Sequence, residues 1–452
     1  MGALGAFSRA AVRLNDATQR WIPGAFTIAW LLTLLVLVLA MTVGRASFTD
    51  SVRYWGDGFW ELLPFSMQMC LVMFTGSIVA VSPPAARFLG WLASLPRSPR
   101  QTVFLMALVS MLLALFHWGL SIVGSAVLLR EIGRRRASVD WRLLVAAAYL
   151  GMGTTWHAGL SASAPLLVAT PGHFLEKEIG LIPVQDTLFA PFNLVLVVVV
   201  MVVFAVLTPL LHPAPEQTVP IRPGQLDAIR LFQPPSRPSG PEGRTLAARI
   251  EHAPWVNGLF GGLAVVWLGT YLARPAHPVT LNALNFVMMG LAVALHPSPA
   301  SLVEAAEDAG KLVFGIILQF PLYAGMYGVI QQTHLAEALA GAFTRVADER
   351  TYPLLVYWYS GIVNYFVPSG GSKWAIEAPY ILSAGQALHV PAAKVVTAYA
   401  WGDMMTDIIQ PFWAVPLLAA ARLDFREILG FCMVLFVVYV PIVSLAFLLF
   451  PR

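Results

Sequence analysis

Long apolar runs separated by short polar stretches divide this chain along its whole length. Runs of about 20 apolar residues are long enough to cross a bilayer as helices. The uninterrupted runs predict such helices near residues 25–43, 63–81, 188–211, 255–272, 279–295, 312–330 and 428–449. The hydrophobic pattern therefore predicts an all-α polytopic membrane protein.

Four further apolar stretches are interrupted near their middles by Gly, Ser, Pro or other polar residues. We predict two helical hairpins, at about 101–130 and about 351–388, and two broken helices, at about 141–170 and about 392–421. The expected breaks are His117–Ser125, Gly151–Ser163, Asn364–Ser372 and Trp401–Gln410. Irregular backbone is tolerated at membrane depth only where protein or a watery cavity surrounds it. The breaks therefore predict a site inside the bilayer.

Basic residues lie on both flanks of the first interrupted run, before residue 101 and after residue 129. Basic loops favour the cytoplasm, so a single crossing would place one of these clusters on the wrong side. A hairpin that enters and leaves the membrane on one side removes the conflict. We therefore predict that both hairpins are re-entrant.

Short strings recur about 250 residues apart, such as Ala-Tyr at 148 and 398 and Pro-Leu-Leu at 165 and 416. These matches predict a first unit over residues 1–212 and a second unit over 274–452. Between them we expect a polar cytoplasmic linker at 213–254 and one connecting transmembrane helix at 255–273. This additional crossing would invert the second unit if the N-terminus is cytoplasmic. Inverted repeats with discontinuous helices are typical of secondary transporters.

Composition supports a membrane protein, with 58% hydrophobic and only 12% charged residues and a mean hydropathy of +0.71. Soluble domains carry about 25% charged residues. The net charge of +4 is explained by basic loops on one side of a membrane, and nucleic acid is not an expected partner. No nucleotide-binding motif is present, which disfavours transport driven by ATP.

The breaks supply the chemistry that a small anion needs. Helix N-termini offer N–H groups and a positive dipole to a carboxylate, and hydroxyls and amides can hydrogen-bond to it. The predicted substrate-binding residues are His117, Gly119, Ser121, Gly124, Ser161, Ser163, Asn364, Ser369, Gly370, Gly371, Ser372 and Lys373.

Asp403 and Asp407 are four residues apart and would share a helix face. Carboxylates inside a membrane are functional candidates, so we predict coupling to Na⁺ or H⁺ at these two residues together with Thr154 and Thr155. A polar cap on a broken helix is the alternative. No other cofactor or bound metal is expected.

Lys373 and Glu377 are also four residues apart, after the second hairpin break. One interpretation places Lys373 beside a substrate carboxylate, and the other pairs it locally with Glu377. His117 and His157 could relay protons or bind anions, although a hydrogen-bonded packing role is the simpler interpretation.

Five longer strings resemble the bacterial short-chain fatty acid transporter family. They are WGDGFWELLPFSMQM (Trp55–Met69), PLLVATPGH (Pro165–His173), GLIPVQDTLF (Gly180–Phe189), FVPSGGSKW (Phe366–Trp374) and AWGD with QPFWAVP (within Ala400–Pro416). The resemblance implies a carrier for small monocarboxylates in the bacterial cytoplasmic membrane. It also implies kinship with dicarboxylate carriers that have paired re-entrant hairpins, often form homodimers and move by an elevator-like mechanism.

Three places depart from the pattern that this resemblance leads us to expect. His117 stands where Asn is expected, Ser372-Lys373 where Gly-His is expected, and TTWHAGL where a Gly-rich run is expected. All three fall at the predicted site, so they bear on the substrate rather than on the fold.

We therefore expect a symporter of short-chain fatty acids or related monocarboxylates that is not an enzyme. The alternatives are a carrier of a different carboxylate, such as a dicarboxylate, and a membrane channel or sensor. An intramembrane hydrolase would need a Ser with His117 or His157, but no nucleophile-elbow G-x-S-x-G occurs.

Overall fold

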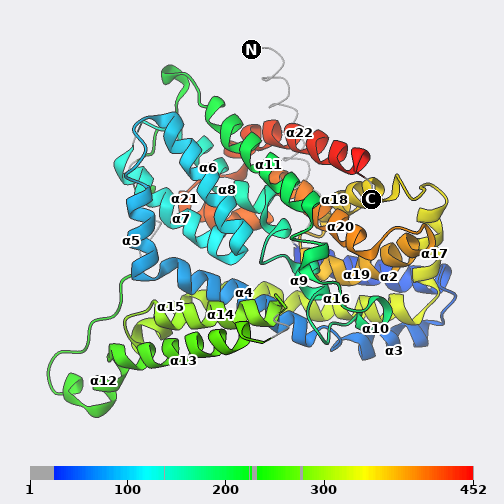
Figure 1. Ribbon diagram of the computed structural model, residues 1–452, viewed down its shortest axis with the longest axis horizontal. Coiled ribbons are helices and arrows are strands. Elements are labelled where there is room, and N and C mark those ends of the chain that lie inside the picture. The colour runs from blue at the N-terminus through cyan, green and yellow to red at the C-terminus, as the bar shows by residue number, and fades with distance from the viewer. Residues whose placement is uncertain (1–24, 137, 223, 227–231, 275–277, 451–452) are drawn as a thin grey trace.

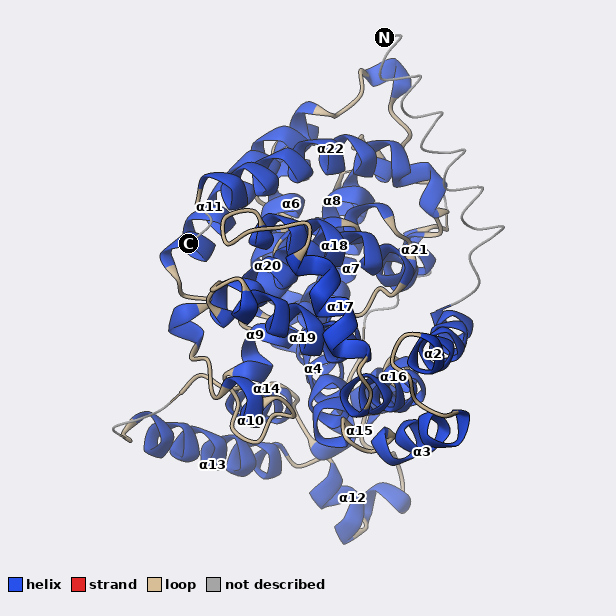
Figure 2. Cartoon of the chain, turned by 90° about the vertical axis from the view of Figure 1, so that its right-hand side faces the viewer, coloured by secondary structure: helices blue, strands red, loops and turns tan. Residues whose placement is uncertain are grey.

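A computed structural model describes residues 25–136, 138–222, 224–226, 232–274 and 278–450. The described residues form helices and connecting segments and no strand, which confirms the all-α class (Figures 1 and 2). The N-terminus, predicted to be cytoplasmic, lies outside them, as do parts of the 213–254 linker.

Within the part of the chain that the structure describes, twelve helical segments precede the linker. They are α2 (Ala25–Thr42), α3 (Phe48–Gly58), α4 (Leu63–Val81), α5 (Pro83–Leu92), α6 (Pro99–Phe116), α7 (Trp118–Arg135), α8 (Trp141–Thr154), η1 (Trp156–Ala158), α9 (Ser163–Val168), α10 (Glu176–Ile179), η2 (Val184–Asp186) and α11 (Pro191–Leu210). The linker region holds η3 (Pro215–Gln217), η5 (Glu242–Arg244) and α12 (Leu246–Glu251), and it is followed by α13 (Pro254–Leu272).

The remaining segments follow a similar order up to the broken helix. They are α14 (Leu281–Ala294), α15 (Pro299–Gly310), α16 (Phe314–Gln332), α17 (Leu335–Thr344), α18 (Tyr352–Phe366), α19 (Gly370–Ala387), α20 (Ala392–Met405), η6 (Asp407–Ile409), η7 (Phe412–Ala414), α21 (Val415–Ala421) and α22 (Phe425–Leu449). Helices α3, α4 and α8 begin 251 residues before α15, α16 and α20, and η1 begins 251 residues before η6. The offset seen in the short sequence strings thus recurs in the positions at which helices begin.

Polar residues start these helices where the sequence supplies a hydrogen-bond acceptor. The side chains of Ser47, Ser98, Asp140, Thr280 and Ser298 accept backbone N–H groups at the starts of α3, α6, α8, α14 and α15. An N-cap of this kind satisfies one of the N–H groups that a helix start leaves free. Short polar segments can therefore separate apolar helices.

Within the described residues, six helices are long and apolar enough to cross a membrane: α4, α6, α11, α13, α16 and α22. The bent pair α20–α21, whose two parts lie 65° apart, would make a seventh. Residues 44–60 contain helix α3, capped by Ser47, and the stretch after α4 contains α5, capped by Ser82.

The breaks are shorter than the sequence predicted. Helix α7 starts at Trp118 and runs through Gly119 and Gly124, so only His117 interrupts the first hairpin. These glycines permit close packing: a Cβ on Gly119 would lie 2.8 Å from the Val72 carbonyl oxygen. The second hairpin breaks at residues 367–369, and the broken helices at residues 155–162 and 406–414.

The first helices of each repeat pack against a helix of the other repeat. Helices α14 and α15 of the second repeat pack against α4 of the first, whereas α2 and α3 of the first pack against α16 of the second. These helices occupy the lower part of Figure 1, and the hairpins with the broken helices α8 and α20 lie above them. Helix α4 meets the first hairpin through α7, and α16 meets the second through α19.

Candidate functional site

The two hairpin tips differ in the groups that accept hydrogen bonds from the free N–H groups of the helix that follows. At the first tip, His117 Nδ1 accepts the Leu120 N–H at 3.3 Å, and Ser161 Oγ accepts the Trp118 N–H at 2.7 Å. At the second tip no side chain caps α19, because the hydroxyls of Ser369 and Ser372 bond to each other at 2.8 Å. The first N–H groups of a helix have no acceptor within it, so α19 presents an open N-terminus.

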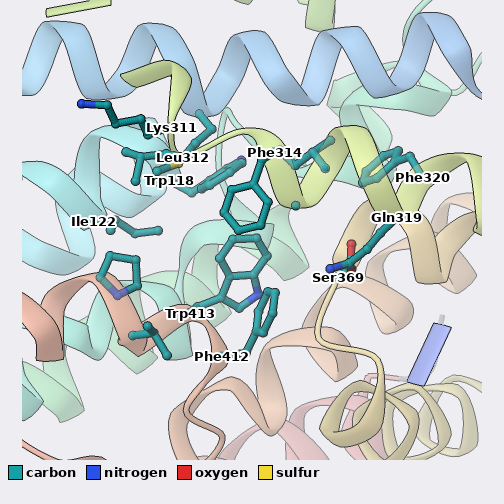
Figure 3. A pocket seen from close by; sticks show the side chains of 15 residues that line it. Trp118, Ile122, Lys311, Leu312, Phe314, Gln319, Phe320, Ser369, Phe412 and Trp413 are labelled. Atoms are coloured by element: carbon teal, nitrogen blue, oxygen red, sulfur yellow. The ribbon is translucent and has the colours of Figure 1, made fainter. Parts of the chain in front are cut away.

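A pocket of about 250 Å³ adjoins this open end. Its walls are mostly apolar, and Ser369 contributes to them (Figure 3). The larger side chains that line it are Trp118, Phe314, Phe320, Phe412 and Trp413. A second space of about 30 Å³ reaches deeper, to Ser163, Gly370 and Gly371. Both spaces are lined by Trp118, Ile316, Phe320, Ser369 and Trp413, so the apolar pocket and the helix start are neighbours.

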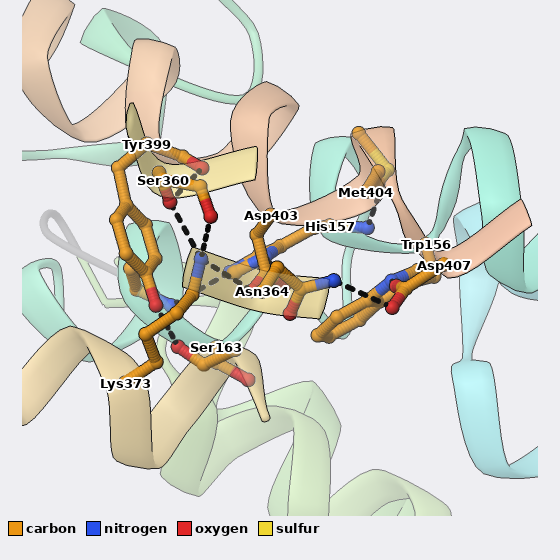
Figure 4. Close-up of polar contacts among 12 residues, drawn as sticks. Trp156, His157, Ser163, Ser360, Asn364, Lys373, Tyr399, Asp403, Met404 and Asp407 are labelled. Carbon is orange, nitrogen blue, oxygen red and sulfur yellow. Dashed lines mark hydrogen bonds and ion pairs between the residues drawn. The ribbon is translucent and has the colours of Figure 1, made fainter. Parts of the chain in front are cut away.

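A buried polar network lies behind the second tip (Figure 4). The Lys373 ammonium contacts Asp403 Oδ1 at 3.0 Å and donates to the Ser360 carbonyl oxygen at 2.8 Å and to the Ser360 hydroxyl at 2.6 Å. The other Asp403 oxygen contacts His157 Nδ1 at 2.8 Å, and His157 Nε2 accepts the Ala164 N–H. The network therefore joins the second hairpin to both broken helices.

Asp407 lies in a neutral environment one turn further along. The Trp156 indole donates to its Oδ2 at 3.0 Å, and the Asn364 and Gln410 amides donate to its Oδ1 at 2.8 and 3.2 Å. Among the described residues it has no ion-pair partner, although it is 1% exposed. Three neutral donors hydrogen-bond to this carboxylate without neutralising its charge.

Gly370 links the open helix start to the network. Its carbonyl oxygen accepts the Tyr399 hydroxyl at 2.7 Å, and the Tyr399 ring lies 4.6 Å from the Lys373 ammonium. A Cβ on Gly370 would lie 2.6 Å from Asp403 Oδ2 and 2.7 Å from a His157 ring carbon. Glycine is therefore needed here for the close approach of hairpin and broken helices.

Residues 6–450 match the short chain fatty acid transporter family. The chain belongs to this family. A protein of Escherichia coli K12, named as a candidate short-chain fatty acid transporter, is 36% identical over 414 residues, which are 92% of this chain and 93% of that one. A Haemophilus influenzae protein with the same name is 32% identical over 442 residues, 96% of this chain and 98% of that one.

Two solved structures share the fold of this transporter family member. The Alcanivorax borkumensis YdaH transporter, described as having an unusual topology, aligns with a TM-score of 0.59 at 16% identity, over 94% of this chain and 98% of that chain. Neisseria gonorrhoeae MtrF, described within a class of antimetabolite efflux pumps, aligns with a TM-score of 0.57 at 14% identity, over 97% and 96%. The predicted family, the multi-pass membrane class and the expectation of a transporter rather than an enzyme are confirmed.

The structure separates the predicted substrate-binding residues of this transporter into three groups. Ser163, Ser369, Gly370 and Gly371 line the pocket spaces. Lys373 and Asn364 belong to the polar network, and Ser372 bonds to Ser369. The others make contacts inside the first half: they are His117, Gly119, Ser121, Gly124 and Ser161. A substrate role for any of them stays a prediction.

Two of the four predicted ion-coupling residues belong to the polar network, and the other two bond to backbone carbonyl oxygens. Asp403 and Asp407 are centres of the network. Thr154 and Thr155 are fully buried, but their hydroxyls donate to the carbonyl oxygens of Leu150 and Met111. The local Lys373–Glu377 ion pair, one of the two alternatives from the sequence, is not formed among the described residues. Neither Glu377 oxygen has a hydrogen bond of standard geometry, although Ser360 is nearby.

Several contributors to the site were missed by sequence reasoning. Ser360 and Tyr399 hold Lys373 and Gly370, and Phe412 and Trp413 form the pocket wall. Phe412 and Trp413 stand in the QPFWAVP string, which could have suggested a role for them. Nothing local points to Ser360, since it lies on the other arm of the hairpin, 13 residues before Lys373.

Proposed function

We propose that this protein is a secondary active transporter of short-chain fatty acids or related small monocarboxylates. The observation that carries the proposal is the open N-terminus of α19 beside the apolar pocket of about 250 Å³. A short-chain fatty acid has a carboxylate, which suits the helix N-terminus, and an apolar tail, which suits the pocket. Family membership and the names of the relatives support the same substrate class.

The carboxylate binds at the N–H groups of Gly370 and Gly371, beside the Ser369 hydroxyl. A helix N-terminus stabilises an anion through these donors and through its dipole. The tail lies against Trp118, Phe412 and Trp413. Each buried CH₂ group contributes about 0.8 kcal/mol, so chain length sets affinity until the pocket is full.

A dicarboxylate is the less suitable substrate. The pocket has one described basic residue in its wall, Lys311, which lies at an exposed position and contacts Asp308 at 2.7 Å. A second carboxylate would therefore lie against aromatic rings without a buried cation, at a large desolvation cost.

The protein works in the bacterial cytoplasmic (inner) membrane with its N-terminus inside. The two repeats have opposite orientations, since α13 adds one crossing between them, and the hairpins are re-entrant. The hairpins with α8 and α20 form a mobile unit that moves as an elevator against the helices in the lower part of Figure 1. The working assembly is a homodimer. The paired interrupted helices support the opposite orientations and the moving unit, and the homodimer is proposed from the resemblance to dicarboxylate carriers.

Uptake is symport, with the substrate anion accompanied by Na⁺ or H⁺. Asp403 and Asp407 are the coupling residues, with Thr154 and Thr155 beside them. The absence of a cation partner for Asp407 among the described residues supports its role, because a buried charge without a counter-charge is costly.

The test is uptake of labelled butyrate and acetoacetate into proteoliposomes under separate Na⁺ and pH gradients. We expect accumulation above the equilibrium level with one of these gradients and equilibration without either. Accumulation of a dicarboxylate but not of butyrate would overturn the substrate class. Movement of butyrate only down its own gradient, at every ion gradient, would indicate a channel instead.

A further inference from the structure

Three oxygen atoms and one aromatic face surround the Lys373 ammonium. The oxygens are the Ser360 carbonyl at 2.8 Å, the Ser360 hydroxyl at 2.6 Å and Asp403 Oδ1 at 3.0 Å. The Tyr399 ring lies on another side, and Lys373 is 1% exposed. Every polar contact of this side chain is therefore to an acceptor within the protein.

A carbonyl, a hydroxyl and a carboxylate are the ligands that hard cations take in proteins. We propose that the Lys373 ammonium is a tethered cation that occupies this position permanently, so that no Na⁺ binds between Ser360 and Asp403 and uptake does not need Na⁺. This inference rests on the proposed transport function and narrows its coupling ion.

The first repeat contains the same contact without the charge. Ser121 lies 252 residues before Lys373, and Ser110 lies 250 residues before Ser360. The Ser121 hydroxyl donates to the Ser110 carbonyl oxygen at 2.9 Å, as the Lys373 ammonium donates to the Ser360 carbonyl. A carbonyl acceptor is thus part of the hairpin scaffold in both repeats.

The counterpart of Asp403 shows why only one repeat needs a cation. Residue 152, which lies 251 residues before Asp403, is a methionine. At this corresponding position the first repeat has no carboxylate, and a neutral hydroxyl donates to the Ser110 carbonyl oxygen. In the second repeat the buried carboxylate needs a counter-charge, and the chain itself supplies one.

A tethered cation has a thermodynamic consequence. It is present at very high effective concentration, so a free cation must compete with it at this position. It is also never released, so it carries no energy from an ion gradient across the membrane. The driving ion must then act elsewhere in the network. At Asp407 three N–H donors already hydrogen-bond to the carboxylate, so we take H⁺ as this ion.

The first experiment compares uptake by the wild-type transporter with Na⁺ replaced by choline on both sides, at the same pH gradient. We expect initial rates within about twofold of each other. A requirement for Na⁺, seen as a loss of tenfold or more in choline, overturns the proposal. Absence of monocarboxylate uptake under every gradient would instead refute the proposed function.

The second experiment measures binding without transport or substrate. Lys373→Ala should open the position, so that Na⁺ raises the unfolding temperature of the purified variant by at least about 2 °C relative to choline. The wild type should show no such rise. A monodisperse variant without a Na⁺-dependent shift contradicts the proposal.

Two further variants make the binding result specific. In Lys373→Ala with Asp403→Asn the shift should vanish, because the carboxylate ligand is gone. Lys394→Ala is the matched control, since the Lys394 ammonium is buried against the Phe450 carbonyl oxygen and the Phe192 ring without a carboxylate. It should gain no response to Na⁺. If Lys373→Ala does not fold, the wild-type uptake comparison decides the question.

Discussion

The two hairpins of this protein share a scaffold but differ in charge and in the state of their tips. In the first, the hydroxyls of Ser110 and Thr155 donate to the carbonyl oxygens of Ala147 and Met111. In the second, the hydroxyls of their counterparts Ser360 and Thr406 donate to those of Tyr399 and Gly361. Four hydrogen bonds thus recur as two pairs, and they hold each hairpin against its broken helix.

At two corresponding positions after the tips, ionisable groups occur only in the second hairpin. Lys373 and Glu377 stand where the first hairpin has Ser121 and Ser125, 252 residues earlier. The first tip is also capped by His117, whereas the start of α19 has no side-chain cap. The difference indicates that the first hairpin has a structural role, whereas the second carries the groups that bind substrate and ion. Four variants test this division.

The largest effect is expected for Asp403→Asn. This change leaves the buried Lys373 ammonium without its carboxylate and His157 without its partner. Removing one member of a buried pair costs about 3–5 kcal/mol, so we expect gradient-driven butyrate uptake to fall at least about 100-fold. The control is Asp50→Asn, which removes an exposed pair with Arg53. Wild-type coupling in Asp403→Asn would remove this residue from the ion site.

The next effect is expected for Gly371→Val at the open tip. A Cβ at this position would already lie 2.8 Å from the Phe65 ring, and the branched side chain would cover the helix start. We expect butyrate affinity, measured by calorimetry on the purified protein, to fall at least about tenfold as donors of about 1.5–3 kcal/mol are blocked. Unchanged affinity would move the substrate away from this tip.

A smaller effect is expected for His117→Ala at the capped tip. The substitution removes the acceptor of the Leu120 N–H, and losing an N-cap costs about 1 kcal/mol. We expect a lower unfolding temperature with butyrate affinity unchanged. The division between the hairpins would be wrong if affinity fell while the unfolding temperature stayed constant.

The smallest effect on stability is expected for Glu377→Gln. The carboxyl group has no hydrogen bond of standard geometry to lose, and glutamine keeps its shape. We expect the unfolding temperature to stay within about 2 °C of the wild type, because a buried carboxyl without good partners adds little net stability. A fall of more than that would mean that Glu377 has a stabilising contact with the Lys373 ammonium.

Sequence patterns located the helices of this fold well because membrane helices depend mainly on length and hydropathy. Helix α4 covers the predicted range 63–81, and α13 begins one residue before the predicted 255. The extent of the breaks was overestimated, because glycine was taken as a helix breaker where it serves close packing, as at Gly119 against Val72.

The site could be predicted only as a neighbourhood. The breaks that hold Ser369 and Asp407, and the last turn of α20 that holds Asp403, were identified because polar residues are rare inside apolar runs. The partner of Lys373 was not, since the sequence offers Glu377 four residues away and gives no sign of Ser360 on the opposite arm. Such pairings depend on how helices pack, and no local pattern encodes them.

Tyr399 makes the open tip and the buried cation parts of one mechanical unit. Its hydroxyl donates to the Gly370 carbonyl oxygen, while the face of its ring contacts the Lys373 ammonium. A ligand that displaces the tip would therefore also change the contact between the Tyr399 ring and the Lys373 ammonium. If a ligand at the tip changes the affinity of the buried network for an ion, thermodynamic reciprocity requires that ion to change the ligand's affinity by the same factor.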